Sequence, residues 1–205
     1  MKIGVVVGTF GTESWAKMGE ESLAKARTQN HASSHEFIHV HGKSLGEARN
    51  KGARYLILAH DVSHLIFLDA DDSLSQNYLV EMEEARKPGV LGIYRPSTLG
   101  VYPDGSTDDE TVMIPRTHMA AGNCIILGAM CDAWLFNEVD GFDVLLPALE
   151  DWDLWLKMLM REATVHDVPE AVYRVGVNEV SRNKNGRDHG NAYATVRRRY
   201  SSQRG

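Results

Sequence analysis

The chain has 205 residues, of which 43% are hydrophobic and 24% are charged, a composition typical of one globular domain with a real core. Its net charge of -6 argues against a general nucleic-acid-binding protein, which would carry a basic face. The two cysteines form neither a disulfide framework nor a zinc-binding pattern, so a reducing, cytoplasmic environment is expected. No run of residues approaches the roughly 18 apolar residues of a membrane span.

Strand and helix patterns alternate along the first half of the sequence. The β-branched run Ile3–Val7 predicts a buried strand, and "HEFIHVHG" and "HLIFLDADD" predict two more. Helical patterns follow the three strands and begin near Trp15, Ser44 and Ser73; the second opens with Ser44 and Glu47 in a capping-box arrangement. This order predicts a parallel sheet covered by helices, in which ligands bind beyond the carboxyl ends of the strands.

The second half is less regular. Residues 90–123 are rich in turns, with one or two short strands expected, and "NCIILGAMCDAWLF" then predicts a strand and a short helix. In "LLPALEDWDLWLKMLMREA" apolar residues recur at i, i+3, i+4 and i+7 from Trp152, which predicts an amphipathic helix, and "TVHDVPEAVYRV" predicts a last strand. We therefore assign residues 1–183 to a single domain and residues 184–205 to a polar, basic tail, either helical or partly disordered.

Three carboxylates, Asp69, Asp71 and Asp72, stand directly after the predicted third strand. Charges this close repel one another and lose hydration when they are buried. In an extended chain Asp69 and Asp71 would share a face and could converge on one cation. Carboxylate oxygens suit Mg²⁺ or Mn²⁺, and a diphosphate would supply further ligands. The alternative is that these residues only cap a helix that begins near Leu74.

A second acidic group, Glu150, Asp151 and Asp153, opens the predicted amphipathic helix. The helix N-terminus favours an ionised Asp151, and an ionised carboxylate beside a cleft can act as a general base. The alternative is simple complementarity between acidic side chains and the dipole of a surface helix. Asp153 points elsewhere on the helix and is expected to be solvated, whereas Trp152 and Trp155 are expected in the core.

The ordered set "ARNKGA", "LIFLDADDSL", "VDGFD" and "LEDWDLWLKM" resembles the family 2 glycosyltransferases of the GT-A fold, and the resemblance extends from Gly4 to Asn183. It implies an α/β, Rossmann-like fold with a mixed, mostly parallel sheet flanked by helices. It also implies an inverting, hexosyltransferase-type activity that depends on Mn²⁺ or Mg²⁺. The donor would be a nucleotide-diphosphate sugar, with a UDP-sugar favoured, and the acceptor an unknown glycan, protein or small molecule.

The resemblance also implies roles for individual residues. Asp151 would be the catalytic base, with Glu150 beside it. Asp71 would be the main metal ligand, with Asp69 as a second ligand near the ribose. The positions that match the nucleotide-sugar site of the family are Gly8, Thr9, Phe10, Arg49, Asn50, Asp69, Ala70 and Asp71.

Two positions depart from the family pattern. "HVHGKS" replaces a second acidic cluster, so His39, His41 or Glu36 is expected near the base, and Gly176 stands where the family often has a histidine that helps to hold the metal and diphosphate. The segment His118 to Asn123 lies where relatives approach the acceptor, although ordinary packing also explains its small residues. One alternative function is a nucleotidyltransferase, against which the absence of arginine from "GTFGTESW" counts. Another is a catalytically weak sugar-nucleotide-binding protein.

Overall fold

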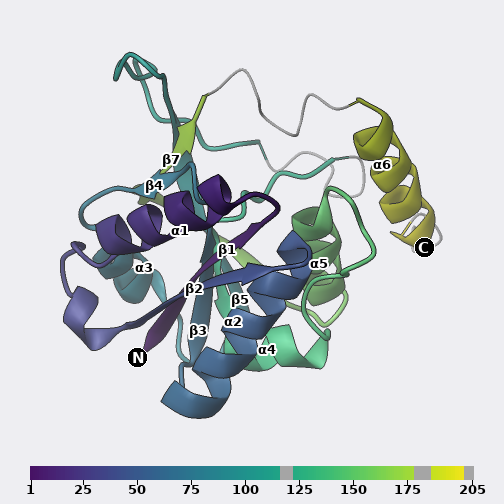
Figure 1. Ribbon diagram of the computed structural model, residues 1–205. Coiled ribbons are helices and arrows are strands. Elements are labelled where there is room, and N and C mark those ends of the chain that lie inside the picture. The colour runs from purple at the N-terminus through teal and green to yellow at the C-terminus, as the bar shows by residue number, and fades with distance from the viewer. Residues whose placement is uncertain (116–121, 178–185, 201–205) are drawn as a thin grey trace.

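The structure is a computed structural model that describes residues 1–115, 122–177 and 186–200. Within these residues the chain forms one seven-stranded sheet with helices on both faces (Figure 1). The strands are β1 (Ile3–Phe10), β2 (Glu36–Gly42), β3 (His64–Leu68), β4 (Ser73–Leu74), β5 (Gly92–Val101), β6 (Met130–Asp132) and β7 (Thr164–Gly176). The helices are α1 (Glu13–Ala26), η1 (Ala32–Ser34, a 3₁₀ turn), α2 (Leu45–His60), α3 (Tyr78–Ala85), α4 (Ala133–Glu138), α5 (Glu150–Leu159) and α6 (Gly186–Tyr200).

The strand order in the sheet is β2-β1-β3-β6-β5-β7-β4. The pairs β1–β2, β1–β3 and β5–β7 are parallel, and the pairs that involve β6 or β4 are antiparallel. Strands β2, β1, β3, β5 and β7 therefore run in one direction and β6 and β4 in the other. The predicted α/β fold with a mixed, mostly parallel sheet flanked by helices is confirmed. As a result, the chain leaves β1, β2 and β3 at the same edge of the sheet, where ligand sites of such sheets form.

Both faces of the central strands are buried, which explains their apolar runs without alternation. Val6 and Phe67 point to one face and pack with α2, α4 and α5, including Trp155. Val7 and Leu68 point to the other face, which α1 and α3 cover. The predicted core position of Trp155 is confirmed, because its side chain is fully buried.

Helix α6 lies in the segment expected to be a polar tail, and it packs against α5 (Figure 1). Tyr193 stacks on Trp152 with ring centroids 5.4 Å apart, and Val196 is fully buried beside them. Arg199 donates a hydrogen bond to Asp153 at 2.9 Å. The expectation that Asp153 is solvated is therefore wrong: it is 1% exposed, because α6 covers that side of α5.

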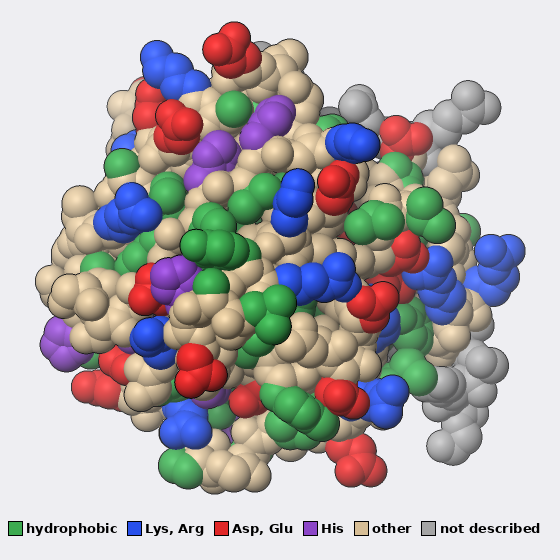
Figure 2. Space-filling view, turned by 60° about the horizontal axis from the view of Figure 1, so that its bottom comes forward, with side chains coloured by type: hydrophobic (Ala, Val, Ile, Leu, Met, Phe, Trp, Pro, Cys, Tyr) green, Lys and Arg blue, Asp and Glu red, His purple; other side chains and the backbone are tan. Residues whose placement is uncertain are grey.

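Two surface properties bear on how the domain could meet partners. In the described part of the chain, no helix combines the length and the apolar character needed to cross a membrane. On the face shown in Figure 2, acidic and basic side chains are interspersed.

Candidate functional site

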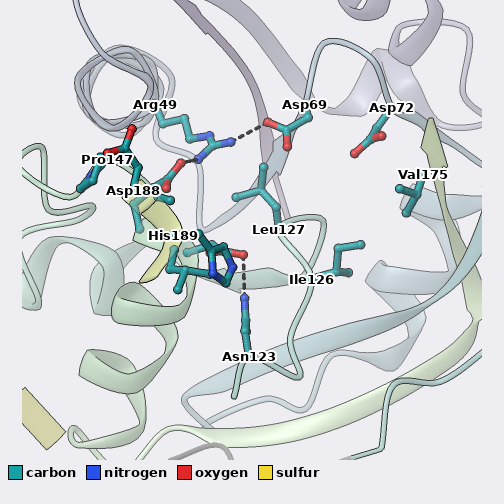
Figure 3. Close-up of a pocket in the computed structure, with 14 residues that line it drawn as sticks. Arg49, Asp69, Asp72, Asn123, Ile126, Leu127, Pro147, Val175, Asp188 and His189 are labelled. Carbon is teal, nitrogen blue, oxygen red and sulfur yellow. Dashed lines mark hydrogen bonds and ion pairs between the residues drawn. The ribbon is translucent and has the colours of Figure 1, made fainter. Parts of the chain in front are cut away.

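A cavity of about 430 Å³ lies where the β3 exit, the start of α5 and the first turn of α6 meet (Figure 3). It is strongly acidic, since five of the side chains that line it are carboxylates. The charged or titratable residues in its wall are Arg49, Asp69, Asp72, Glu150, Asp151, Asp188 and His189. Segments far apart in the sequence thus bring both predicted acidic groups to one cavity.

The acidic segment after β3 is a turn, because the N–H of Asp72 donates to the carbonyl oxygen of Asp69 at 3.1 Å. The extended conformation assumed for the Asp69–Asp71 pair is therefore wrong. Asp69 lines the cavity, the exposed Asp71 lines an adjoining hollow of about 370 Å³, and Asp72 borders both. The helix-capping alternative is also wrong, because strand β4 follows the turn and α3 begins only at Tyr78.

Arg49 joins the two acidic groups from its position on α2. Its side chain is 2% exposed, Nη2 donates to Asp69 Oδ1 at 2.5 Å, and Nη1 donates to Glu150 Oε1 at 2.8 Å. Burial alone would lower the pKa of Arg49, but Asp69 and Glu150 together raise it above its ordinary value. Gly8 makes room for this side chain, since a Cβ on Gly8 would lie 2.7 Å from Arg49 Cγ. The buried cation therefore ties the turn after β3 to the start of α5.

Asp151 lies in the first turn of α5 and has a hydrogen-bond donor on each oxygen. The N–H of Trp152 donates to Oδ1 at 2.8 Å, and Asn123 Nδ2 donates to Oδ2 at 2.7 Å. Burial, followed by repulsion from Glu150, raises the pKa of Asp151 to about 7. The effect of burial on the pKa therefore outweighs the effect of the helix N-terminus, which was expected to keep this carboxylate ionised. A carboxyl group with this pKa exchanges protons readily near neutral pH, which suits a general base.

Asp72 lines the cavity, and Gly176, which contacts it, lines the adjoining hollow. Burial, followed by repulsion from Asp69, raises the pKa of Asp72 to about 8, although the N–H of Gly176 donates to its Oδ1 at 2.8 Å. A Cβ on Gly176 would overlap the carbonyl oxygen of Asp71, so no histidine fits at this position unless the turn moves. The imidazole in the wall is instead that of His189 on α6, in the segment that sequence reasoning treated as a tail.

The ends of β1 and β2 bring Thr9 together with two histidines. The Thr9 hydroxyl is 2.7 Å from His39 Nε2 and 3.0 Å from His41 Nδ1. Burial lowers the pKa of His39. Phe10 is the last residue of β1. The role of these residues near a nucleotide base remains a prediction.

Asn50 and Ala70 lie away from the cavity. Asn50 is buried and exchanges two hydrogen bonds with the backbone of Phe142, at 2.9 and 2.8 Å, so it fixes the "GFD" segment. Ala70 is buried and borders the adjoining hollow with Asp71. His118, part of the segment predicted near the acceptor, lies outside the described residues, whereas Asn123 of that segment lines the cavity.

Among the side chains that the structure describes, no group of three or more His, Cys, Asp or Glu residues is arranged to hold a metal ion. A divalent cation of the Mg²⁺ type typically takes only one or two carboxylates together with substrate phosphates. The acidic turn fits that requirement. Asp71 is exposed, and after burial the repulsion from Asp69 and Asp71 is a further cause of the raised pKa of Asp72, a repulsion that a cation would relieve.

The strand order and the flanking helices give a mixed, mostly parallel α/β fold in which the acidic turn after β3 and the acidic start of α5 line one cavity. No protein-family model and no curated protein matches the sequence. Among solved structures, S. aureus TarS shares 15% identity at a TM-score of 0.59, over 86% of this chain and 37% of that chain.

Two complexes of TarS 1-349 are also similar to this chain. The complex with UDP-GlcNAc has 15% identity and a TM-score of 0.61, over 88% of this chain and 60% of that one. The complex with UDP has 16% identity and a TM-score of 0.58, over 87% and 61%. The chain thus spans less than two thirds of these proteins, and at this identity the likeness shows a shared fold.

Proposed function

We propose that the protein is a glycosyltransferase of the inverting, hexosyltransferase type, with a nucleotide-diphosphate sugar as donor and a UDP-sugar favoured. The observation that carries the proposal is the cavity in which Asp69 of the acidic turn and Asp151 of α5 face the same space, with Arg49 bound to both segments. TarS, which shares the fold, supports the choice of donor through its complexes with UDP-GlcNAc and UDP.

In the proposed reaction, Asp151 accepts the proton of the acceptor hydroxyl. The acceptor oxygen forms a bond to the anomeric carbon on the side opposite the leaving group. The bond between the anomeric carbon and the diphosphate oxygen breaks, and its electron pair leaves with the nucleoside diphosphate, so the configuration inverts. Asp71, with Asp69, would hold Mn²⁺ or Mg²⁺, which supplies positive charge at the leaving diphosphate.

Arg49 and Glu150 have positioning roles in this scheme. Both terminal nitrogens of Arg49 are bonded to carboxylates, so we do not assign the guanidinium to the nucleotide. Glu150 accepts one of these bonds and thereby fixes the first turn of α5, which carries Asp151. A rigid base of this kind lowers the entropic cost of reaching the reactive geometry.

A sugar-nucleotide-binding protein with little turnover is the second candidate. The observation that favours it is Gly176, where the turn leaves no room for a metal-binding side chain. This candidate and the leading one both predict nucleotide binding, and they differ in turnover.

Calorimetry with UDP, GDP, dTDP and CDP, each with and without Mn²⁺, tests the donor class. We expect one nucleotide, most favourably UDP, to bind to the wild type only in the presence of Mn²⁺. In Asp71→Ala we expect this binding to be lost. Asp109→Ala, which removes an exposed carboxylate outside the site, is the matched control. If no nucleotide binds under any condition, the proposed function is wrong.

Hydrolysis of UDP-sugars then separates the two candidates. Turnover by the wild type that is lost in Asp151→Asn, while nucleotide binding is retained, supports the transferase. Nucleotide binding without turnover, in the presence of a broad set of acceptors, supports the binding protein.

A further inference from the structure

Asn123 contacts two groups whose chemistry fixes the orientation of its amide. Its Oδ1 accepts the backbone N–H of Ile125 at 3.1 Å, and its Nδ2 donates to Asp151 Oδ2 at 2.7 Å. A backbone N–H can only donate, so the amide oxygen must face Ile125 and the amide nitrogen must face Asp151. Asn123 therefore presents a donor, and never an acceptor, to this carboxyl group.

The Asp151 carboxylate is held at both oxygens by neutral donors. The N–H of Trp152 donates to Oδ1, and Asn123 donates to Oδ2. Rotation of the carboxylate would break both hydrogen bonds at once. Figure 3 shows the bond from Asn123 as a dashed line beside His189, at the edge of the cavity. The lone pairs of Asp151 that take no part in these two hydrogen bonds therefore keep a fixed direction.

The charged or titratable groups around Asp151 come from three other segments as well as from α5. Glu150 is its neighbour on α5, Asp69 and Asp72 lie at the β3 exit, Arg49 lies on α2, and Asp188 and His189 line the cavity from α6. Both terminal nitrogens of Arg49 are bonded to other carboxylates. A neutral amide stabilises the ionised carboxylate less than a direct cation would, and so leaves a base that can still take a proton.

We infer that Asn123 is the positioning residue of the proposed general base: its amide fixes the orientation of the Asp151 carboxylate and stabilises the ionised form. The inference rests on the proposed function, because it gives Asp151 its role as base. The family resemblance implied only that the segment of Asn123 lies near the acceptor, and the comparisons give this residue no role in holding the base.

The direct test is the pKa of Asp151 in the folded protein, measured by carbon-13 NMR on protein labelled at the aspartate carboxyl carbon. Its signal is assigned by its loss in Asp151→Asn. In Asn123→Ala we expect an upward shift of about one pH unit, the size of one charge-assisted hydrogen bond lost from a carboxylate. In Asn123→Asp, which keeps the shape but replaces the donor by a second carboxyl group, we expect a larger upward shift.

Asn137→Ala, on the exposed side of α4, is the matched control and should leave the pKa of Asp151 unchanged. Asn123→Ser keeps a smaller donor at the position and serves if the alanine variant does not fold. In the pH profile of UDP-sugar hydrolysis, the midpoint should move with the NMR pKa and the maximal rate should fall roughly 10- to 100-fold.

An Asp151 pKa that is the same in the wild type, Asn123→Ala and Asn123→Asp would overturn the inference. A merely structural role would change stability without moving this pKa. The NMR measurement needs no turnover, so it decides on the coupling between Asn123 and Asp151 even if calorimetry shows that no nucleotide binds. Failure of the proposed function and failure of this inference are therefore distinguishable.

Discussion

Substitution of Asp151 by asparagine should remove a loss of stability that the wild type suffers as the pH rises, while abolishing turnover. Burial raises the pKa of Asp151 from 3.8 to about 7, so the folded state binds a proton that the unfolded state has already lost. The stabilising contribution of this group is fully present below pH 3.8 and is lost as the pH rises through 7. Asparagine does not ionise, and the variant should escape this loss.

The magnitude follows from the pKa shift. One unit corresponds to about 1.4 kcal/mol, so the wild type would lose roughly 2.7 kcal/mol between pH 5 and pH 9. Asp151 keeps partial contact with solvent in the cavity wall, which lowers the expected value to about 2 kcal/mol. The asparagine side chain has only one oxygen for the two donors that face Asp151, but this cost is the same at every pH and cancels in the comparison.

Urea denaturation of both proteins between pH 5 and pH 9 measures the effect. The free energy of unfolding of Asp151→Asn, minus that of the wild type, should rise by about 2 kcal/mol over this range. All other titrating groups are common to both proteins, so their contributions to the free energy of unfolding largely cancel in the difference. If the two stabilities run parallel over the whole range, Asp151 does not titrate in the folded protein between pH 5 and pH 9, and a pKa near 7 is refuted.

Three further substitutions test the packing of the site by urea denaturation. Gly176→Ala forces a Cβ into the carbonyl of the acidic turn and should cost about 1–3 kcal/mol, whereas Gly190→Ala, where a Cβ meets nothing within 4 Å, should be neutral or slightly stabilising. Arg49→Met leaves two carboxylates without their shared cation and should cost about 3–5 kcal/mol. Arg199→Met removes a hydrogen bond to the buried carboxylate of Asp153 on α5 and should cost about 2 kcal/mol. Its control, Arg161→Met at an exposed position, should change stability little. Equal effects of these two substitutions would contradict the packing of α6 against α5.

Local patterns predicted the parts of the fold that local physics determines. The buried run of β1 and the acidic end of β3 are visible in the sequence because a strand covered on both faces must be apolar throughout. The predicted cap of α2 is present, with the hydroxyl of Ser44 accepting the N–H of Glu47 at 3.2 Å, whereas the Glu47 carboxylate accepts the N–H of Lys43 and not that of Ser44. The start of α5 beside Asp151 was also predicted, since the helical period of its aromatic residues is a local signal.

Such local patterns could not predict the contacts between segments that are far apart in the sequence. Arg49 and Glu150 are 101 residues apart in the sequence, and nothing in either segment indicates the other as its partner. Helix α6 was treated as a tail because its surface is polar, while the few residues that fix it, such as Tyr193 and Val196, act only against α5. The conformation of the Asp69–Asp72 turn likewise depends on its fit against the end of β7, through the N–H of Gly176.

The position of α6 and the proton affinity of the proposed base are physically connected. Burial is the largest cause of the raised pKa of Asp151, and α6 contributes Asp188 and His189 to the wall of the same cavity. That helix is anchored at its far end, where Arg199 pairs with the buried Asp153 at 2.9 Å. Because a carboxyl group that regains water becomes a stronger acid, detachment of α6 would return the pKa of Asp151 toward its ordinary value. We therefore expect the charge state of Asp151 to respond to a contact at the opposite end of α6 from the cavity.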